Sequence, residues 1–353
     1  MGPSGGRRLI AFIDDLNMPK KDSFGSQPPL ELLRQWIDYG GWYDRTKQSW
    51  RYIMDATLVA AMGPPGGGRT VISERLQSRF NLINFTFPSD AQVRLIFESI
   101  LTPKLLTFGD EIKALGPAIV NASVQLYKAV IEKFLPTPSK AHYLFNMRDI
   151  AKVIQGVMQA RRGAADTKET MLRLWAHEAM RVFSDRFTNP GDVSMFRDLL
   201  DERLVACDIS YARVMAGIEA PLLGPVFCDF ASEAKGGEGE DAPYLEVTDL
   251  SRLKTLLEDK LFEYNNEPGY MPMDLVLFRD AIRHVSRIQR VLRQPRGNCM
   301  LVGVGGSGRQ SLARLAAWVS EMSVFQVRAS VRACARAREV ALTESDVRAA
   351  PTD

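Results

Sequence analysis

The sequence contains little cysteine and little histidine, with four cysteines and three histidines among 353 residues. The cysteines show no Cys-x-x-Cys spacing, so we expect neither a disulfide framework nor a zinc site, and a reducing cytosol is the expected compartment. They are Cys207, Cys228, Cys299 and Cys334. The histidines lie far apart without the spacing of metal ligands, and we interpret them as core or surface residues. They are His142, His177 and His284.

The sequence also lacks a strong excess of charge and a long hydrophobic run. Its formal net charge of +3 is too small to indicate a nucleic-acid or membrane partner, which would need a concentrated basic face. No apolar run approaches the roughly 18 residues of a membrane span, and the first residues lack the apolar core of a signal peptide. With 46% hydrophobic and 25% charged residues, the composition is typical of a soluble intracellular protein of two or three domains.

The most informative segment is LIAFIDDLNMP, from Leu9 to Pro19. An apolar run that ends in two adjacent carboxylates predicts a buried parallel strand that brings both acids to the edge of a sheet. A P-loop NTPase places its Walker B acids beside magnesium and the attacking water in this way. In that interpretation Asp14 holds the magnesium ion and Asp15 orients or deprotonates the water. The alternative is a strand that simply ends in two solvated aspartates.

The first hundred residues alternate between strand and helix patterns, which indicates a parallel sheet covered by helices. A proline start and a Gly-Gly end mark one of the helices, and a glycine- and proline-rich loop occupies 63–69. The predicted helices are 28–39, 73–80 and 89–101, and the predicted strands after the first are 57–62 and 82–87.

From about Gly109 onward the pattern becomes helical, with apolar residues at three-to-four spacing. Asn146 and Asp166 are expected to cap two of these helices, and the glycine- and acid-rich stretch 232–243 is expected to be an exposed loop or linker. The predicted helices are 111–134, 146–161, 166–186, 192–205, 250–264, 272–293 and 309–322, with a strand at 298–302. The fold class is therefore α/β, a partial parallel sheet with a helical lid, followed by the start of a second α/β core.

The segment GVGGSGRQS resembles a phosphate-binding loop, because it follows a predicted strand, opens a predicted helix and has G-x-x-x-x-G spacing. Arginine stands where such loops carry lysine, and glutamine, a poor magnesium ligand, stands where they carry Ser or Thr. We therefore expect phosphate binding without hydrolysis here, and the alternative is a purely structural turn. The candidate binding residues are Gly303, Gly305, Gly306, Ser307, Gly308, Arg309, Gln310 and Ser311.

Two arginines are candidates for contact with nucleotide. Arg79, near the end of a short predicted helix, lies where an AAA+ module exposes an arginine to its neighbour's nucleotide; a plain surface arginine is the alternative. Arg148, at the start of a predicted lid helix, is placed to reach the γ-phosphate of its own module, and an intrahelical ion pair is the alternative. Nearby aromatic residues are interpreted as packing rather than ligand stacking. They are Trp36, Trp42, Tyr43 and Trp50.

Several rare strings resemble the third AAA+ module of a dynein heavy chain of the axonemal type. They are FIDDLNMP, FGSQPPLEL, WYDR, AAMGPPGGGR, FNMRD and WAHE. The loop from Gly303 to Leu312 resembles the one that opens the fourth module, where axonemal dyneins commonly carry the same Gly-Arg-Gln-Ser ending. The similarity runs from about Leu9 to Gln326, and the residues from Val327 onward do not resemble the family.

The resemblance implies an AAA+ P-loop NTPase fold divided into a partial α/β core (1–108), a helical lid (109–231), a linker and connecting helix (232–270), the start of the fourth module (271–327) and an atypical tail (328–353). It implies ATP or ADP and Mg²⁺ as ligands, with Asp14 and Asp15 as Walker B acids, Arg79 as the trans arginine and Arg148 as the lid sensor. Gly63 stands where many members carry a polar sensor.

The implied function is part of a six-module ATPase ring that walks on microtubules and bends cilia and flagella, together with dynein intermediate and light chains. No phosphate loop precedes Asp14 and Asp15, and no pair of Walker B acids follows the glycine loop that begins at Gly303. We therefore expect a piece of a longer chain that does not hydrolyse ATP alone. The alternative is a non-catalytic interaction module that binds dynein subunits or another partner. A free-standing P-loop kinase or GTPase is disfavoured, because Gln310 stands where such loops carry the Ser or Thr that binds magnesium.

Overall fold

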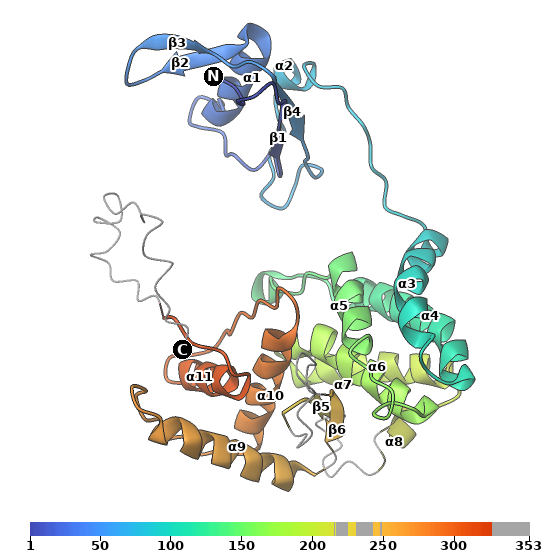
Figure 1. The fold of residues 1–353 in the computed structure, drawn as a ribbon. Helices are drawn as coiled ribbons and strands as arrows, with labels where there is room; N and C mark the ends of the chain where they lie inside the picture. The colour runs from blue at the N-terminus through green and yellow to red at the C-terminus, as the bar shows by residue number, and fades with distance from the viewer. Residues whose placement is uncertain (215, 217–224, 231–242, 248, 327–353) are drawn as a thin grey trace. The chain divides into compact units, whose positions relative to one another are not determined.

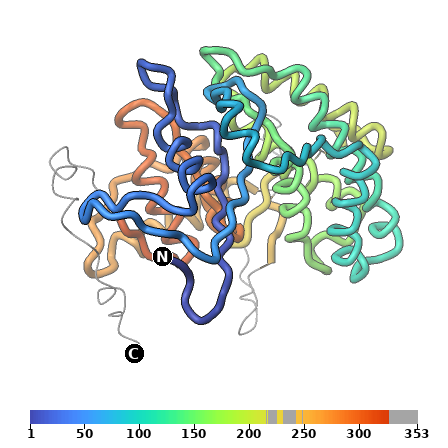
Figure 2. The backbone as a smooth tube through the Cα atoms, turned by 90° about the horizontal axis from the view of Figure 1, so that it is seen from above, coloured from blue at the N-terminus to red at the C-terminus, as the bar shows by residue number. Residues whose placement is uncertain are grey.

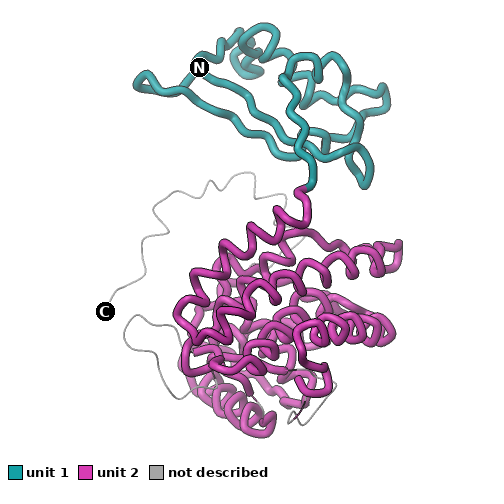
Figure 3. The backbone as a smooth tube through the Cα atoms, turned by 90° about the vertical axis from the view of Figure 1, so that its right-hand side faces the viewer, with its two compact units in different colours: residues 1–87 teal, residues 88–353 magenta. Residues whose placement is uncertain are grey.

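The computed structural model describes residues 1–214, 216, 225–230, 243–247 and 249–326. The chain divides into unit 1, Met1–Phe87, and unit 2, Pro88–Asp353 (Figure 3), and each is described by itself. Most of the predicted linker 232–243, the whole of the predicted tail and Cys334 lie outside the described residues.

Unit 1 is built on two parallel strands. β1 (Leu9–Ile13) pairs in register with β4 (Ala56–Ala60), so that Ile13 lies opposite Ala60 (Figure 1). α1 (Pro28–Tyr39) starts with proline in its first turn and ends at Gly40, which takes the left-handed conformation with a φ of 71°. Both signals confirm the helix predicted at 28–39. A small core joins these elements, formed by Leu16, Leu30, Ile72 and Leu76.

The sequence analysis missed a hairpin in unit 1. β2 (Gly41–Asp44) and β3 (Ser49–Tyr52) form an antiparallel pair. The predicted aromatic packing is confirmed, because the rings of Trp36 and Trp42 meet edge to face at 5.8 Å and those of Tyr43 and Trp50 at 4.9 Å. Edge-to-face contacts of this kind stabilise neighbouring strands and helices.

Two expectations for unit 1 are wrong, and one predicted short helix is shorter than expected. β1 is not buried, since Ile10 is 68% and Phe12 63% exposed; among the described residues it pairs with β4 alone. Residues 82–87 form no strand, and the helix predicted at 73–80 is the single turn α2 (Glu74–Gln77). An apolar run becomes a strand only where a second strand takes its hydrogen bonds, and no described strand does so for 82–87.

The helical part of unit 2 confirms the helices predicted between residues 89 and 205. Its long helices are α3 (Asp90–Leu105), α4 (Asp110–Lys133), α5 (Met147–Val157), α6 (Lys168–Phe183) and α7 (Pro190–Val205), with a short α8 (Tyr211–Val214) and 3₁₀ turns at Pro138–Lys140 and Ser184–Arg186. The pairs α3–α4 and α5–α6 lie side by side (Figures 1 and 2). Trp175 is fully buried in their core and donates its indole N–H to the Ser123 hydroxyl at 2.8 Å.

Helix caps in unit 2 agree with the prediction at one position and differ at another. The Asn146 side chain accepts from the backbone N–H of Arg148, and the Asp149 carboxylate reaches back to the Asn146 N–H, so a capping box starts α5. The prediction that Asp166 caps α6 is wrong. Thr167 does so, while the Asp166 carboxylate accepts from the Gly163 N–H at 2.9 Å and holds the preceding turn.

The remainder of unit 2 surrounds a second core. β5 (Val226–Cys228) and β6 (Leu245–Val247) form an antiparallel pair, followed by α9 (Leu250–Asn266), α10 (Arg279–Arg293) and α11 (Arg309–Val319). α10 therefore starts seven residues later than predicted, and α11 ends three earlier. The predicted strand 298–302 is wrong, since no described strand pairs with it, and Val302 is 88% exposed.

Among the described residues, Cys207 and Cys299 carry free thiols. No group of three or more His, Cys, Asp or Glu side chains in this part of the chain could hold a metal ion. None of the helices in the described part is long and apolar enough to pass through a membrane.

Candidate functional site

The two predicted Walker B acids lie where β1 ends. Asp14 is exposed, and its Oδ1 accepts from the backbone N–H of Asp15 at 3.0 Å. Asp15 takes a left-handed conformation with a φ of 49°, which aspartate tolerates better than most residues. The chain thus turns at Asp15, two residues after the end of β1, and the Asp15 side chain is 44% exposed. The sheet edge offers two carboxylates to solvent.

Asp15 has a cationic partner that the sequence analysis did not identify. Arg69 donates from Nε at 3.1 Å and from Nη2 at 3.0 Å to Oδ1 of Asp15. Its guanidinium also lies over Gly63, where an added Cβ would come within 3.2 Å of Nε. Arg69 therefore occupies the space beside Gly63. The pair is half-exposed, so it contributes little to stability by itself.

Buried amides hold the loops around these acids in place. Asn17 is 1% exposed and donates from Nδ2 to the Gly63 carbonyl at 2.8 Å. Gln27 donates from Nε2 to the Pro19 carbonyl at 2.7 Å and to the Thr70 hydroxyl at 2.8 Å. Because these bonds join the segment after β1 to the loop after β4, Asp15 and Arg69 are presented from a connected framework.

The donor set at the end of β1 suits magnesium. Mg²⁺ prefers oxygen ligands and is commonly held by one or two protein carboxylates together with substrate phosphates and water. Asp14 provides an exposed carboxylate of that kind, while Asp15 is engaged with Arg69. Asp14 is accordingly the residue that would hold the ion.

Arg79 lies just after α2 and is bound within its own unit. Its Nε contacts Asp38 Oδ1 at 2.8 Å, and its side chain is 49% exposed. Asp38 also accepts from Arg34 at 2.9 Å. The guanidinium is thus oriented by an acid of α1 while about half of its surface remains open.

The glycine loop of unit 2 opens α11 as predicted. Gly306 and Gly308 take positive φ values of 77° and 72°, which only glycine adopts at low cost. Arg309 turns back and donates from Nη2 to the Val304 carbonyl at 3.0 Å. An open hollow of about 1050 Å³ lies over the loop and is lined in part by Gln310 and Ser311. Backbone N–H groups at the start of a helix suit a phosphate group, whereas Gln310 does not suit magnesium.

Arg148 lies in the first turn of α5, in unit 2, and its side chain is exposed. The intrahelical ion pair considered as an alternative does not form with the described residues. The nearby carboxylate of Asp149 is instead paired with Lys152 at 3.3 Å and with Arg186 at 3.1 Å. Asp14, Asp15 and Arg79 belong to unit 1, and Arg148 and the glycine loop belong to unit 2.

Three family models match the chain. Residues 1–88 match the P-loop containing dynein motor region, residues 96–192 the dynein heavy chain ATPase lid domain, and residues 273–336 the P-loop containing dynein motor region D4. The human protein "Dynein axonemal heavy chain 2" is 51% identical over 326 residues, which cover 92% of this chain and 7% of that protein. This chain belongs to the dynein heavy chain family. Its fold is accordingly the α/β fold of AAA+ proteins.

Other relatives agree with this assignment. The mouse protein of the same name is 52% identical over 326 residues, covering 92% of this chain and 7% of the relative. "Dynein-1-beta heavy chain, flagellar inner arm I1 complex" of Chlamydomonas reinhardtii is 49% identical over 327 residues, with the same shares of 92% and 7%. The dynein chain described here thus spans about 7% of these relatives' length. The D4 match extends to residue 336, so the resemblance ends later than the Gln326 boundary taken from the sequence.

A buried polar network in this dynein chain joins the lid to the fourth-module part and was not predicted. It starts at the WAHE motif of α6. His177 Nδ1 lies 2.6 Å from the Pro225 carbonyl, and its Nε2 lies 3.0 Å from the hydroxyl of Tyr244. Tyr244 donates to Glu178 Oε1 at 3.0 Å. Arg290 of α10 donates from Nε to both oxygens of Glu178 at 3.1 Å.

Burial and charge act in opposite directions within this network. Burial works to lower the pKa of Arg290, but the charge and hydrogen bonds of Glu178 outweigh it, so the net shift is upward. Burial, with the neighbouring Glu178 charge, raises the pKa of Tyr244 well above its ordinary value. Tyr244 therefore stays a neutral donor, and Arg290 stays the cation that compensates Glu178.

The buried His177 predicts a stability that falls in acid. Burial, followed by the charges of Arg181, Arg290 and Arg287, holds the pKa of His177 well below 6.5. Glu178 Oε1 lies 3.8 Å from its Nε2 but is committed to Arg290. Below about pH 6.5 the unfolded chain binds a proton that the folded chain excludes, so the free energy of unfolding falls by up to about 1.4 kcal/mol per pH unit.

Urea unfolding at pH 7.5, 6.5 and 5.5 measures this dependence. His177→Gln, which keeps a polar side chain without titrating, should flatten the pH dependence. His142→Gln, at an exposed histidine, should leave it as in the wild type. Equal slopes in the wild type and in His177→Gln would contradict the assignment.

A glycine of α5 makes room for the network. A Cβ at Gly156 would lie 1.9 Å from Oε2 and 2.2 Å from Cδ of Glu178. Gly156→Ala is therefore expected to lower the free energy of unfolding by about 1–3 kcal/mol, although alanine is the better helix former by about 1 kcal/mol. Thermal or urea unfolding measures the change. Gly116→Ala is the control, because its Cβ meets only a Leu105 methyl at 3.0 Å; equal effects of the two substitutions would refute the argument.

Proposed function

We propose that this chain is part of the ATP-driven motor ring of an axonemal dynein heavy chain, which moves cilia and flagella by acting on microtubules. The observation that carries the proposal is the 51% identity over 92% of the chain to an axonemal heavy chain. The expected ligands are ATP or ADP and Mg²⁺. The expected partners are the rest of the heavy chain ring, the dynein intermediate and light chains and, through the whole motor, microtubules in the axoneme.

The proposed division of the chain keeps the boundaries expected from the sequence. They are a third-module core at 1–108, its lid at 109–231, a linker and connecting helix at 232–270, the start of the fourth module at 271–327 and a tail at 328–353. Matches at 1–88, 96–192 and 273–336 and the unit boundary after Phe87 support this order of modules.

We assign roles to the site residues on their chemistry. Asp14 holds Mg²⁺, and Asp15 orients or deprotonates the attacking water. Arg79 faces the nucleotide of a neighbouring module, and Arg148 contacts the γ-phosphate of its own. When bound, ATP would supply the phosphoryl group, and Mg²⁺ would neutralise its negative charge. In the fourth module the phosphate-binding residues are Gly303, Gly305, Gly306, Ser307, Gly308, Arg309, Gln310 and Ser311, where nucleotide binding with little turnover is proposed.

The 353-residue chain by itself is expected not to hydrolyse ATP. Phosphoryl transfer depends on positioning phosphate, metal and water together, and the acids and the glycine loop here come from two different modules. A malachite-green assay on purified protein should show no phosphate release above buffer. Turnover that disappears in Asp15→Ala would overturn this prediction.

An alternative function is a non-catalytic interaction module that binds dynein subunits or another partner. The exposed apolar side chains of β1 favour it, since Ile10 and Phe12 remain open to solvent. Microtubule gliding by a heavy chain that contains this segment separates the two functions. Asp14→Ala with Asp15→Asn should slow gliding if the segment acts through nucleotide. Unchanged gliding in that variant, with gliding lost when Ile10 and Phe12 are both changed to serine, would support the interaction module instead.

A further inference from the structure

Arg79 of unit 1 is anchored both through its backbone and through its side chain. Leu76 of α2 is 1% exposed and belongs to the same small core as Leu30 of α1. The Arg79 N–H donates to the Leu76 carbonyl at 3.0 Å, and the Arg79 Nε contacts Oδ1 of Asp38 at 2.8 Å. The turn that carries Arg79 and the direction of its guanidinium are therefore both fixed against the same helix, α1.

Asp38 divides its two carboxylate oxygens between two arginines. Its Oδ1 faces Arg79, and its Oδ2 accepts from Nη1 of Arg34 at 2.9 Å. Arg34 is held in turn by Glu31, whose Oε2 accepts from Nε at 2.8 Å. Glu31, Arg34 and Asp38 are spaced so that they share one face of α1. Because the Asp38 side chain is only 12% exposed, this row of contacts fixes the carboxylate that Arg79 meets.

The rest of the Arg79 guanidinium is open. Its side chain is 49% exposed, and in the part of the chain that the structure describes no hydrogen bond joins its Nη1 or Nη2 to another residue. A guanidinium carries five N–H donors in a fixed fork. The contact at Nε therefore sets the direction of the fork and leaves its terminal donors for an acceptor that unit 1 does not supply.

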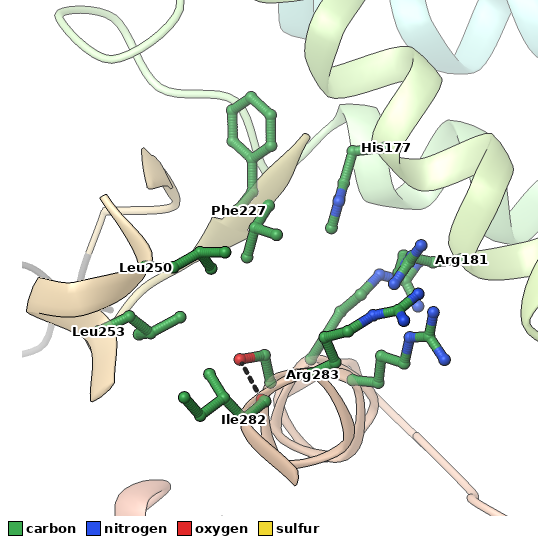
Figure 4. Close-up of a pocket in the computed structure, with 11 residues that line it drawn as sticks. His177, Arg181, Phe227, Leu250, Leu253, Ile282 and Arg283 are labelled. Atoms are coloured by element: carbon green, nitrogen blue, oxygen red, sulfur yellow. Dashed lines mark hydrogen bonds between the residues drawn. The ribbon is translucent and has the colours of Figure 1, made fainter. Parts of the chain in front are cut away.

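Two arginines of unit 2 show the contrast. Arg181 from α6 and Arg283 from α10 line a cavity with room for about one water (Figure 4). Arg181 is only 6% exposed and contacts Asp185 at 3.4 Å. A guanidinium enclosed in this way cannot reach a second polypeptide. Arg79 combines a fixed acidic partner with an open side, and this combination suits a contact across an interface between modules.

We propose that Asp38 is a positioning residue for Arg79, through which a neighbouring module binds a nucleoside triphosphate in preference to a diphosphate. The inference rests on the role proposed above for Arg79, which faces the nucleotide of that module. A trans arginine stabilises negative charge on the terminal phosphoryl group, and its planar fork must be aligned with the phosphate oxygens. Because Asp38 orients Arg79 before nucleotide arrives, less side-chain entropy is lost on binding.

The ratio of two dissociation constants tests the proposal. A heavy chain that contains this segment keeps its phosphate-loop lysine only in the module that Arg79 faces, with alanine in the others, and is titrated with ADP and with the non-hydrolysable triphosphate AMPPNP. Arg79→Gln should lower the preference for AMPPNP by at least about tenfold, the effect of losing a charge-assisted hydrogen bond. Asp38→Ala should lower it by about two- to tenfold, because Arg79 must then be ordered on binding. Purely structural damage would weaken AMPPNP and ADP alike.

Three further variants complete the experiment. Asp38→Ala added to Arg79→Gln should have no further effect, because Asp38 acts through Arg79. Arg34→Gln keeps Asp38 but removes its second partner, so it should lower the preference by a smaller factor, and it is the test if Asp38→Ala does not fold. Asp44→Ala is the matched control, since this acid contacts Arg51 at 3.6 Å on the hairpin of the same unit, and it should leave the ratio unchanged.

The outcomes separate this inference from the proposed function. An unchanged ratio in Arg79→Gln would show that Arg79 does not face a nucleotide, and the proposed role of Arg79 would fail together with the inference. A loss in Arg79→Gln with none in Asp38→Ala and Arg34→Gln would overturn the positioning role alone. An equal loss in Asp44→Ala, a stronger preference for AMPPNP in Asp38→Ala, or a further loss in the double variant would overturn it as well.

Discussion

Replacing Arg290 with methionine is expected to lower the free energy of unfolding of this dynein chain by about 3–5 kcal/mol. The substitution leaves the Glu178 carboxylate, which is 0% exposed, without its cation and with only Tyr244 as a described donor. A buried charge that loses its partner costs far more than the pair contributes when both members are present. Urea unfolding measures the effect as a lower midpoint at an unchanged m-value.

The control for this experiment is a pair on the surface. Lys254 and Glu258 lie 3.6 Å apart on α9, and about half of each side chain is exposed. Lys254→Met should therefore change stability by no more than about 1 kcal/mol. Combining Arg290→Met with Glu178→Gln should restore part of the lost free energy of unfolding, because neither member of this pair is then charged. Similar losses in Arg290→Met and Lys254→Met would show that the network is not the electrostatic link between the lid and the fourth-module part.

The helices of this chain could be predicted because their signals are local. Pro28 and Gly40 mark the two ends of α1, and Asn146 with Asp149 marks the start of α5, all within a few residues of the helix itself. Strands give no such local evidence. The apolar stretches 82–87 and 298–302 have strand composition, but a strand forms only with a neighbour, and a neighbour cannot be recognised from the stretch alone.

The same distinction applies to the site. The pattern of Leu9 to Asp15 was enough to place two acids at a strand end. Arg69 lies 54 positions from Asp15, and Arg290 lies 112 from Glu178, so their partners could not be identified from spacing. The sequence nevertheless contained a signal that Arg69 lies close to Asp15, in the position of the loop that carries Arg69. Its loop follows β4, and the carboxyl ends of adjacent parallel strands meet at one sheet edge.

Asp15→Asn is expected to slow ATP hydrolysis at the third module by about 10²–10⁴-fold in a heavy chain that contains this segment. Asparagine keeps the size of the side chain but cannot take a proton from water. Arg69 sharpens the expectation, because the carboxylate that it holds at 3.0 Å must be released or shared for Asp15 to reach the water. The measurement is the fraction of bound triphosphate left after a single turnover, with the lysines of the ring's other phosphate loops replaced by alanine.

Asp44→Asn provides the matched control, since it makes the same chemical change on the β2–β3 hairpin of unit 1, away from the end of β1. It should leave the rate unchanged. Arg69→Met should affect the rate without lowering stability by more than about 1 kcal/mol, because the pair with Asp15 is half-exposed. If Asp15→Asn and Asp44→Asn hydrolyse at the same rate, Asp15 is a solvated strand end. The two carboxylates that follow β1, Asp14 and Asp15, would then have a structural role and no role in nucleotide hydrolysis.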